Sequence, residues 1–323
     1  MTPADLRLSP LDRGQLLAAL VVGVLLVIPL ALKVPLYIDD FGRSLSGSYD
    51  WSKDGRPLAE LIYKILMLDA DRVVLTSPLG QLLCLPGMAM SSWLLCRIFN
   101  HRQIWAAALA TIFLFGQPYA LQTLSYSFDS PLMVFAVLLS VAAGACLVLG
   151  TSHLSRITAV TLVVSSLATY QPANSAFWII VLMAVIFPCT PRERSGWRLL
   201  RDLLSCQLVA LLIYKYALFN QVELKDYAEH HAALPSISDL PVVLFSNCSG
   251  YFQILFDDWW GTPVGDVFLV AALVALVNAC ICTVEGSRWQ AIGMSGVRSL
   301  MVLAIVSVSH GLLLVLSLSL IHI

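Results

Sequence analysis

The chain has 323 residues, of which 59% are hydrophobic and 12% are charged, with a net charge of -1. Soluble domains carry about 25% charged residues, so this composition excludes an ordinary soluble globular protein. Neither the Gly-x-Gly-x-x-Gly pattern nor a Walker pattern occurs in the sequence. We therefore expect neither a soluble nucleotide as direct substrate nor a nucleic-acid partner.

Long runs without Asp, Glu, Lys or Arg predict membrane-spanning helices, because one span needs about 20 apolar residues. The run 157–191 is too long for one span, and the sequence Tyr170-Gln171-Pro172 predicts a tight hairpin that divides it. The chain is therefore predicted to be an all-α integral membrane protein, a single domain over 1–323 with about nine transmembrane helices. Their approximate ranges are 14–36, 77–98, 104–121, 131–150, 154–171, 174–189, 202–219, 264–284 and 299–320.

Both ends of the chain leave a question. The first span resembles a signal peptide in position, but no small-x-small site follows it and Asp5 and Asp12 dilute the positive charge before it, which favours an uncleaved anchor. The last span ends at Ile323 without a basic flank or polar tail. That ending is typical of a C-terminally truncated member of a longer family.

The distribution of charge between the loops predicts the orientation. With a cytoplasmic N-terminus, the inner loops hold eleven of the 19 Lys and Arg residues but five of the 20 Asp and Glu residues, as the positive-inside rule requires. The two longest polar segments, 37–76 and 220–263, then face outward. Loops of this length are usually functional or disordered, and the Trp, Tyr and Leu content of both argues against disorder.

The first outer loop carries the densest group of reactive side chains. Asp39 and Asp40 follow the first span closely, where a carboxylate meets both a lipid headgroup and a soluble hydroxyl. Neighbouring residues of a helix project about 100° apart, so we expect one acid to face a cavity and the other to be anchored. The alternative is that one of them only caps a short helix beginning at Phe41.

Cations and an aromatic side chain follow in the same loop. Arg43 and Arg56 carry guanidinium groups suited to bidentate contact with a phosphate, unless they pair with nearby aspartates instead. Trp51 fits an interfacial aromatic belt or an apolar face against a sugar ring.

Three further candidates lie on later outer segments. Asp129 stands at the outer end of the fourth span, where an ionisable side chain is costly and is either functional or a helix cap. Tyr170 and Gln171 lie at the hairpin tip and either hydrogen-bond a sugar or satisfy a broken helix end.

No metal or other cofactor is predicted. Most of the eight cysteines fall inside predicted spans, without the spacing of a disulfide framework or a zinc site. His230 and His231 are adjacent in the second long loop, and adjacent histidines alone do not make a metal site. The sequence leaves a metal requirement open.

Several motifs together resemble the glucosyl transferase II family of serotype-converting O-antigen glucosyltransferases. They are Asp39-Asp40-x-x-Arg43, Trp51, Gly55-Arg56-Pro57-Leu58, and the segments 126–133 and 167–172. The resemblance covers roughly residues 1–190. It implies a GT-C-like multi-span helical bundle with a helical first outer loop.

The resemblance also implies an activity. The family transfers a glucosyl unit from a polyprenyl-phosphate-linked sugar to a cell-surface polysaccharide, such as lipopolysaccharide O-antigen, at the periplasmic face of the bacterial inner membrane. Asp39 and Asp40 would be the catalytic pair, one of them the general base, and Arg43 and Arg56 would bind the donor phosphate. Implied partners are the donor, the acceptor, the lipid bilayer, a flippase and a donor-synthesising glycosyltransferase.

Two alternatives of other classes stay open. A transporter or flippase for lipid-linked sugars would carry charged groups and broken helices near the membrane centre, whereas the ionisable residues here crowd the outer surface. A non-catalytic envelope-assembly membrane protein would not need the acid, arginine and aromatic cluster of the first loop.

Overall fold

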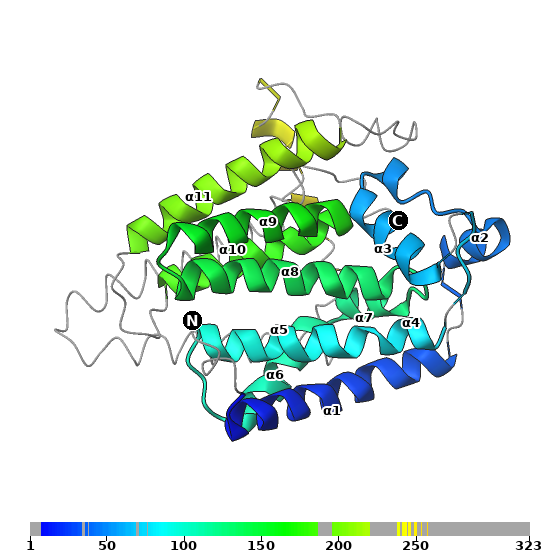
Figure 1. The fold of residues 1–323 in the computed structure, drawn as a ribbon, viewed down its shortest axis with the longest axis horizontal. Coiled ribbons are helices and arrows are strands. Elements are labelled where there is room, and N and C mark those ends of the chain that lie inside the picture. The colour runs from blue at the N-terminus through cyan, green and yellow to red at the C-terminus, as the bar shows by residue number, and fades with distance from the viewer. Residues whose placement is uncertain are drawn as a thin grey trace. The chain divides into compact units, whose positions relative to one another are not determined.

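The computed structural model describes residues 8–33, 36–37, 39–68, 71–75, 77–186 and 196–219, with a few further positions between 238 and 257. The chain divides into two compact units, Met1–Ala228 and Glu229–Ile323, and all the helices labelled in Figure 1 belong to the first. The predicted spans 264–284 and 299–320 lie outside the described residues, as do His230 and His231.

The first unit is helical, and the part of it that the structure describes contains no strand. Its long helices are α1 (Pro10–Lys33), α5 (Cys84–Ile98), α6 (Ile104–Phe115), α8 (Ser130–Leu149), α9 (His153–Thr169), α10 (Asn174–Ile186) and α11 (Gly196–Ile213). The shorter ones are α2 (Asp39–Ser46), α3 (Pro57–Met67), α4 (Leu79–Leu82) and α7 (Pro118–Ser125), the 3₁₀ turns η2 (Ser52–Asp54) and η3 (Gln171–Ala173), and the π-helix η4 (Tyr214–Leu218).

The prediction of an all-α protein with a helical first loop is confirmed for the described residues, since α2, η2 and α3 occupy the loop 37–76. Within the first unit, each predicted span contains helix in its described residues. Among the described residues of the chain, three helical stretches are long and apolar enough to cross a membrane: Pro10–Leu32, Leu79–Ile98 and Ser130–Leu149. Two shorter apolar helices, Ile104–Phe115 and Gln171–Val185, accompany them. The chain thus has the character of a membrane protein, and the predicted number of nine spans is not confirmed.

The long helices run back and forth and pack in a simple order. Figure 1 shows α1 at one side, followed by α5, α8 and α9, with α11 at the other side; α6 packs on α1 and α5, and α10 packs on α8 and α11. Helices α2 and α3 lie together at one end of this array. The array therefore has two distinct ends, and the first loop belongs to one of them.

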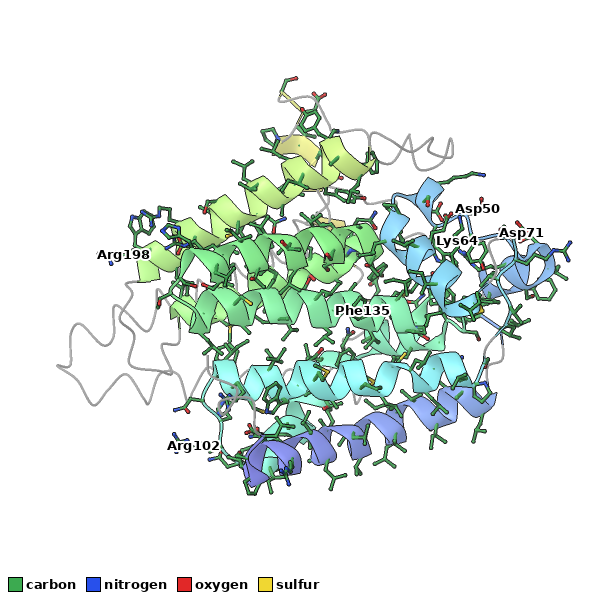
Figure 2. All side chains as sticks on the ribbon, in the orientation of Figure 1. Asp50, Lys64, Asp71, Arg102, Phe135 and Arg198 are labelled. Atoms are coloured by element: carbon green, nitrogen blue, oxygen red, sulfur yellow. The ribbon has the colours of Figure 1, made fainter. Side chains whose placement is uncertain are left out.

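Labelled charged side chains lie at both ends of the array. Figure 2 labels Asp50, Lys64 and Asp71 at the end that carries α2 and α3, whereas Arg102 and Arg198 lie at the opposite end. Arg102 and Arg198, which were predicted to share a membrane side, therefore lie at the same end of the unit.

Small and hydroxylated residues let the central helices approach closely. A Cβ atom added at Gly144 in α8 would lie 2.9 Å from Cγ2 of Ile180 in α10. The hydroxyl groups of Ser140 and Ser166 lie 2.8 Å apart between α8 and α9. Close contact through small residues and interhelical hydrogen bonds are the usual means of helix association where lipid removes the hydrophobic driving force.

Buried polar contacts tie α1 to its neighbours at the other end. The Asp12 carboxylate accepts a hydrogen bond from Trp93 Nε1 at 2.8 Å and lies 3.4 Å from the guanidinium of Arg97. Gln15 Nε2 donates to the backbone carbonyls of His101 and Gln103. Helix α1 is thus an integral member of the unit.

Alanine substitutions at two helical glycines should have opposite effects on stability. Replacing Gly144 by Ala forces overlap with Ile180 and should destabilise the protein by about 1–3 kcal/mol, whereas the Cβ of Gly42→Ala meets nothing within 4 Å and should stabilise α2 by about 0.5–1 kcal/mol. Thermal unfolding in detergent measures both. The double variant Gly144→Ala/Ile180→Ala should be less destabilised than the sum of its single variants, and plain additivity would contradict the close contact.

Candidate functional site

The Asp40 carboxylate is fully buried and holds the first loop to the turn before α8. Its Oδ2 accepts hydrogen bonds from the backbone N–H of Ser127 at 2.6 Å and of Tyr37 at 3.2 Å, and its Oδ1 accepts one from Phe128 N–H at 3.2 Å. Burial raises the pKa of this carboxyl above its usual 3.8, although the three amides oppose the shift. Asp40 is therefore the anchored acid of the pair.

Asp39 begins α2, and its side chain lies outside the described part of the structure. We expected one acid to be anchored and the other to face a cavity. The structure describes only the first of these, the anchored position of Asp40.

Asp129, the residue after Phe128, makes a second buried contact with the first loop. Its Oδ1 accepts a hydrogen bond from Trp51 Nε1, and its Oδ2 lies 4.0 Å from the guanidinium of Arg43. Asp129 occupies the N-cap position of α8 but makes no side-chain cap bond. Its carboxylate therefore serves the loop and does not cap the helix.

The Trp51 ring is enclosed by a cation and an aromatic ring. The guanidinium carbon of Arg43 lies 3.9 Å from the Trp51 centroid, and the Tyr63 ring stacks on Trp51 with centroids 4.7 Å apart. Arg43 also donates from Nη1 to the Tyr49 carbonyl at 2.8 Å, and Tyr63 Oη donates to the Phe128 carbonyl. Trp51, which is 0% exposed, is thus a core residue of the loop in this structure.

A second polar corner joins three distant segments at Gly55. Gln171 Nε2 donates to the Gly55 carbonyl and to Tyr214 Oη, both at 2.9 Å, and Tyr214 Oη donates to the same carbonyl at 2.6 Å. Gly55 has φ +75°, and an added Cβ would lie 2.9–3.0 Å from Phe219, Gln171 and Tyr214. Only glycine fits here, since both the backbone conformation and the space exclude a side chain.

Arg56 follows Gly55 and lies against the hairpin tip. Its guanidinium carbon is 5.0 Å from the Tyr170 ring centroid. Among the described residues no carboxylate pairs with it, and its buried Nε has no hydrogen-bond partner. Of the two arginines predicted for phosphate contact, Arg43 is paired with Asp129, and Arg56 is the one without an acidic partner in the described part of the chain.

The structure thus brings Asp40, Arg43, Trp51 and Asp129 into one connected cluster and places Arg56, Tyr170 and Gln171 in the corner beside it. A backbone bond from Arg56 N–H to the Trp51 carbonyl, 2.8 Å long, joins the two groups. Sequence reasoning missed Tyr63 and Tyr214. Neither carries a local signal, because a tyrosine in an apolar helix is ordinary and both partners are far away in the sequence.

Metal ligands do not gather at this site. The described residues contain no group of three or more His, Cys, Asp or Glu side chains that could hold a metal ion. The ordered acids are instead bound by amides, an indole and cations. Glu60, for example, accepts from Ser52 N–H at 2.9 Å and lies 2.7 Å from Lys64 Nζ.

Comparison with known proteins gives one family and one curated relative. The family model described as Glucosyl transferase GtrII matches residues 28–323. An uncharacterised 55.3 kDa protein in the gtrB 5' region of Salmonella phage P22 is 25% identical over 248 residues, which is 75% of this chain and 50% of that protein. The chain thus spans about half the length of the curated relative it matches. No solved structure matches.

The buried pair of Arg43 and Asp129 predicts strong coupling between the two side chains. Arg43→Met leaves the Asp129 carboxylate without a cation and should lower the free energy of unfolding by about 3 kcal/mol. The double variant Arg43→Met/Asp129→Asn should recover part of that loss, because no charge is left unpaired. Lys64→Met is the control: its side chain is 40% exposed, and a loss of no more than about 1 kcal/mol is expected. Equal destabilisation in the single and double variants would refute the coupling.

Proposed function

Since the chain belongs to the glucosyl transferase GtrII family, we propose that it is an integral-membrane glycosyltransferase of the GT-C type. The transferred group is a glucosyl unit, the donor is a polyprenyl-phosphate-linked sugar, and the acceptor is a cell-surface polysaccharide such as lipopolysaccharide O-antigen. The observation that carries the proposal is Arg56, a guanidinium without an acidic partner among the described residues. It lies at the same end of the helices as the acid pair of α2, as a site for an anionic lipid donor requires.

The site faces the periplasm of a bacterial inner membrane in this proposal. The support is the position of Arg102 and Arg198, which lie at the end of the first unit opposite the first loop. Positive loops favour the cytoplasmic side, so the first loop faces the other.

Asp39 is assigned the general base. The Asp40 carboxylate already accepts three backbone hydrogen bonds in a buried position, which suits an anchor better than a group that must receive a proton from a substrate. Asp39 takes the proton from the acceptor hydroxyl as its oxygen bonds to the anomeric carbon. The bond between that carbon and the phosphate oxygen breaks, and the polyprenyl phosphate leaves with the electron pair.

Arg56 is assigned the role of binding the leaving phosphate. That group gains negative charge as the bond breaks, and a fixed cation nearby stabilises the transition state more than the ground state. Arg43 keeps a supporting role, because its guanidinium is engaged by Asp129, Trp51 and the Tyr49 carbonyl. Its cation and the indole of Trp51 hold the loop that carries the acid pair.

The remaining partners follow from the chemistry of the donor. A donor with its sugar on the periplasmic side requires an enzyme that makes the lipid-linked sugar and a flippase that moves it across the membrane. The acceptor polysaccharide meets the same outer end of the helices.

Replacing Asp39 by Asn tests the assignment of the base. We expect transfer of the labelled sugar to fall by about 10²–10⁴-fold, the usual contribution of a general base, with an unchanged unfolding temperature. Asp50→Asn is the control, since Asp50 forms a partly exposed pair with Lys53 at 3.0 Å. Full transfer activity in the Asp39→Asn variant would refute the assignment.

Arg56→Gln tests the phosphate contact. The affinity for polyprenyl phosphate should fall by about tenfold or more, the loss of a charge-assisted hydrogen bond, while the unfolding temperature stays within experimental error because no acid loses its partner. The matched control is Lys53→Gln, a cation of the same loop with 55% exposure. Unchanged lipid binding by Arg56→Gln would contradict the contact.

A further inference from the structure

Buried polar atoms without a partner occur at Arg56 and in the segment that follows Tyr170, whose ring Arg56 contacts. Among the described residues, the atoms without a hydrogen bond include Nε of Arg56, Oε1 of Gln171, Oδ1 of Asn174 and Nε1 of Trp178. A buried polar atom left unpaired costs about 1–3 kcal/mol, and such atoms in native proteins call for an explanation. Four of them in one region indicate a missing partner.

Three of these residues lie on two consecutive helices, η3 and α10. Gln171 begins η3, and Asn174 begins α10 directly after it. The spacing 171, 174, 178 is i, i+3, i+7, which puts the side chains in a row along the helix. The row starts at the Gly55 corner, because the Nε2 of Gln171 donates to the Gly55 carbonyl there.

The rest of the amide of Gln171 is free for another ligand. Its Nε2 is fixed by Gly55 and Tyr214 at 2.9 Å each, so its orientation is set and Oε1 is turned away from those partners. Pro172 carries no backbone N–H, and its carbonyl is taken by the Ser175 hydroxyl at 2.8 Å. Pro172 and Ser175 therefore do not compete for hydrogen bonds with Gln171, Asn174 and Trp178.

Of the other unpaired buried atoms among the described residues, Nε of Arg43 belongs to a guanidinium that already contacts Asp129 and the Tyr49 carbonyl, and three more lie deeper in the core. Gln81, Ser130 and Gln207 are at most 4% exposed, so single buried waters suit them. Gln171, Asn174 and Trp178 are each partly exposed as residues, although their unpaired atoms are themselves buried. This difference separates the row from the ordinary polar defects of a helical core.

The chemistry of the row fits a sugar. Gln171 Oε1 and Asn174 Oδ1 accept hydrogen bonds, Trp178 Nε1 donates one, and hydroxyl groups do both. The indole also offers an apolar face, which suits the C–H surface of a hexose ring. Arg56 at the head of the row supplies the cation for a phosphate attached to that sugar.

We infer that Gln171, Asn174 and Trp178 form the subsite for the hexosyl group of the lipid-linked donor, with Arg56 at its phosphate. The inference rests on the proposed function and adds Asn174 and Trp178 as residues that recognise the sugar. Asn174 and Gln171 accept from its hydroxyl groups, and Trp178 donates to a ring or hydroxyl oxygen. The subsite lies on the first unit alone.

The test compares two probes on the full chain in detergent: a short-chain polyprenyl phosphate and the same lipid phosphate carrying glucose. Equilibrium binding of each is measured for the unmodified chain, Asn174→Ala, Trp178→Phe and the control Gln207→Met. Removing one hydrogen bond should weaken binding of the glucose-bearing lipid by about tenfold, with the affinity for the bare lipid phosphate unchanged. The control should leave both affinities unchanged.

The outcomes separate the two proposals. If Asn174→Ala and Trp178→Phe keep the ratio of the two affinities, the subsite is refuted and the function stands. Equal loss of both ligands in these variants also refutes it, because the residues then serve the fold. If the unmodified chain binds neither lipid, both the proposed function and the subsite are refuted. Unfolding temperatures check the fold, and Asn174→Ser replaces Trp178→Phe if that variant does not fold.

Discussion

The fully buried carboxylate of Asp40 is the constraint on which the candidate site depends. It binds the backbone N–H groups of Ser127 and Phe128 and so joins the start of α2 to the turn before α8. This contact fixes where Asp129 can lie. From there the indole of Trp51 reaches Asp129, and the Trp51 carbonyl receives the N–H of Arg56. One buried charge thus sets the path of the whole first loop.

The two buried acids are stabilised by different means. That difference decides which arginine has no acidic partner among the described residues. The Asp40 carboxylate accepts hydrogen bonds from backbone amides, so it needs no basic side chain as a partner. Asp129 draws on Arg43 and Trp51. Because neither acid draws on Arg56, this guanidinium lies against Tyr170 without a counter-charge among the described residues. The cation available for an anionic substrate follows from how the acids are satisfied.

The sequence was sufficient for the helices of the first unit and insufficient for the contacts within the candidate site. Apolar runs placed the helices of the first unit, and Tyr170-Gln171-Pro172 correctly marked the turn between α9 and α10. Adjacent acids, by contrast, look alike in a sequence, and only the amides of residues 127 and 128 distinguish Asp40. The corner at Gly55 needs Tyr214, which lies 159 residues away. Contacts of that range depend on helix packing and leave no local pattern.

Helix packing also explains how the polar groups of the candidate site come together. Between the helices the contacts are small residues and hydroxyl pairs such as Ser140 and Ser166, which satisfy their polar atoms inside the protein, as lipid requires. At the end of the array, Gly55 lets a loop carbonyl approach Gln171 and Tyr214 without a side chain between them. That approach places Gln171 beside the corner that Arg56 follows, and Asn174 and Trp178 lie farther along the chain in α10. A lipid-linked sugar has the same order of parts, with its phosphate between an apolar chain and a polar ring.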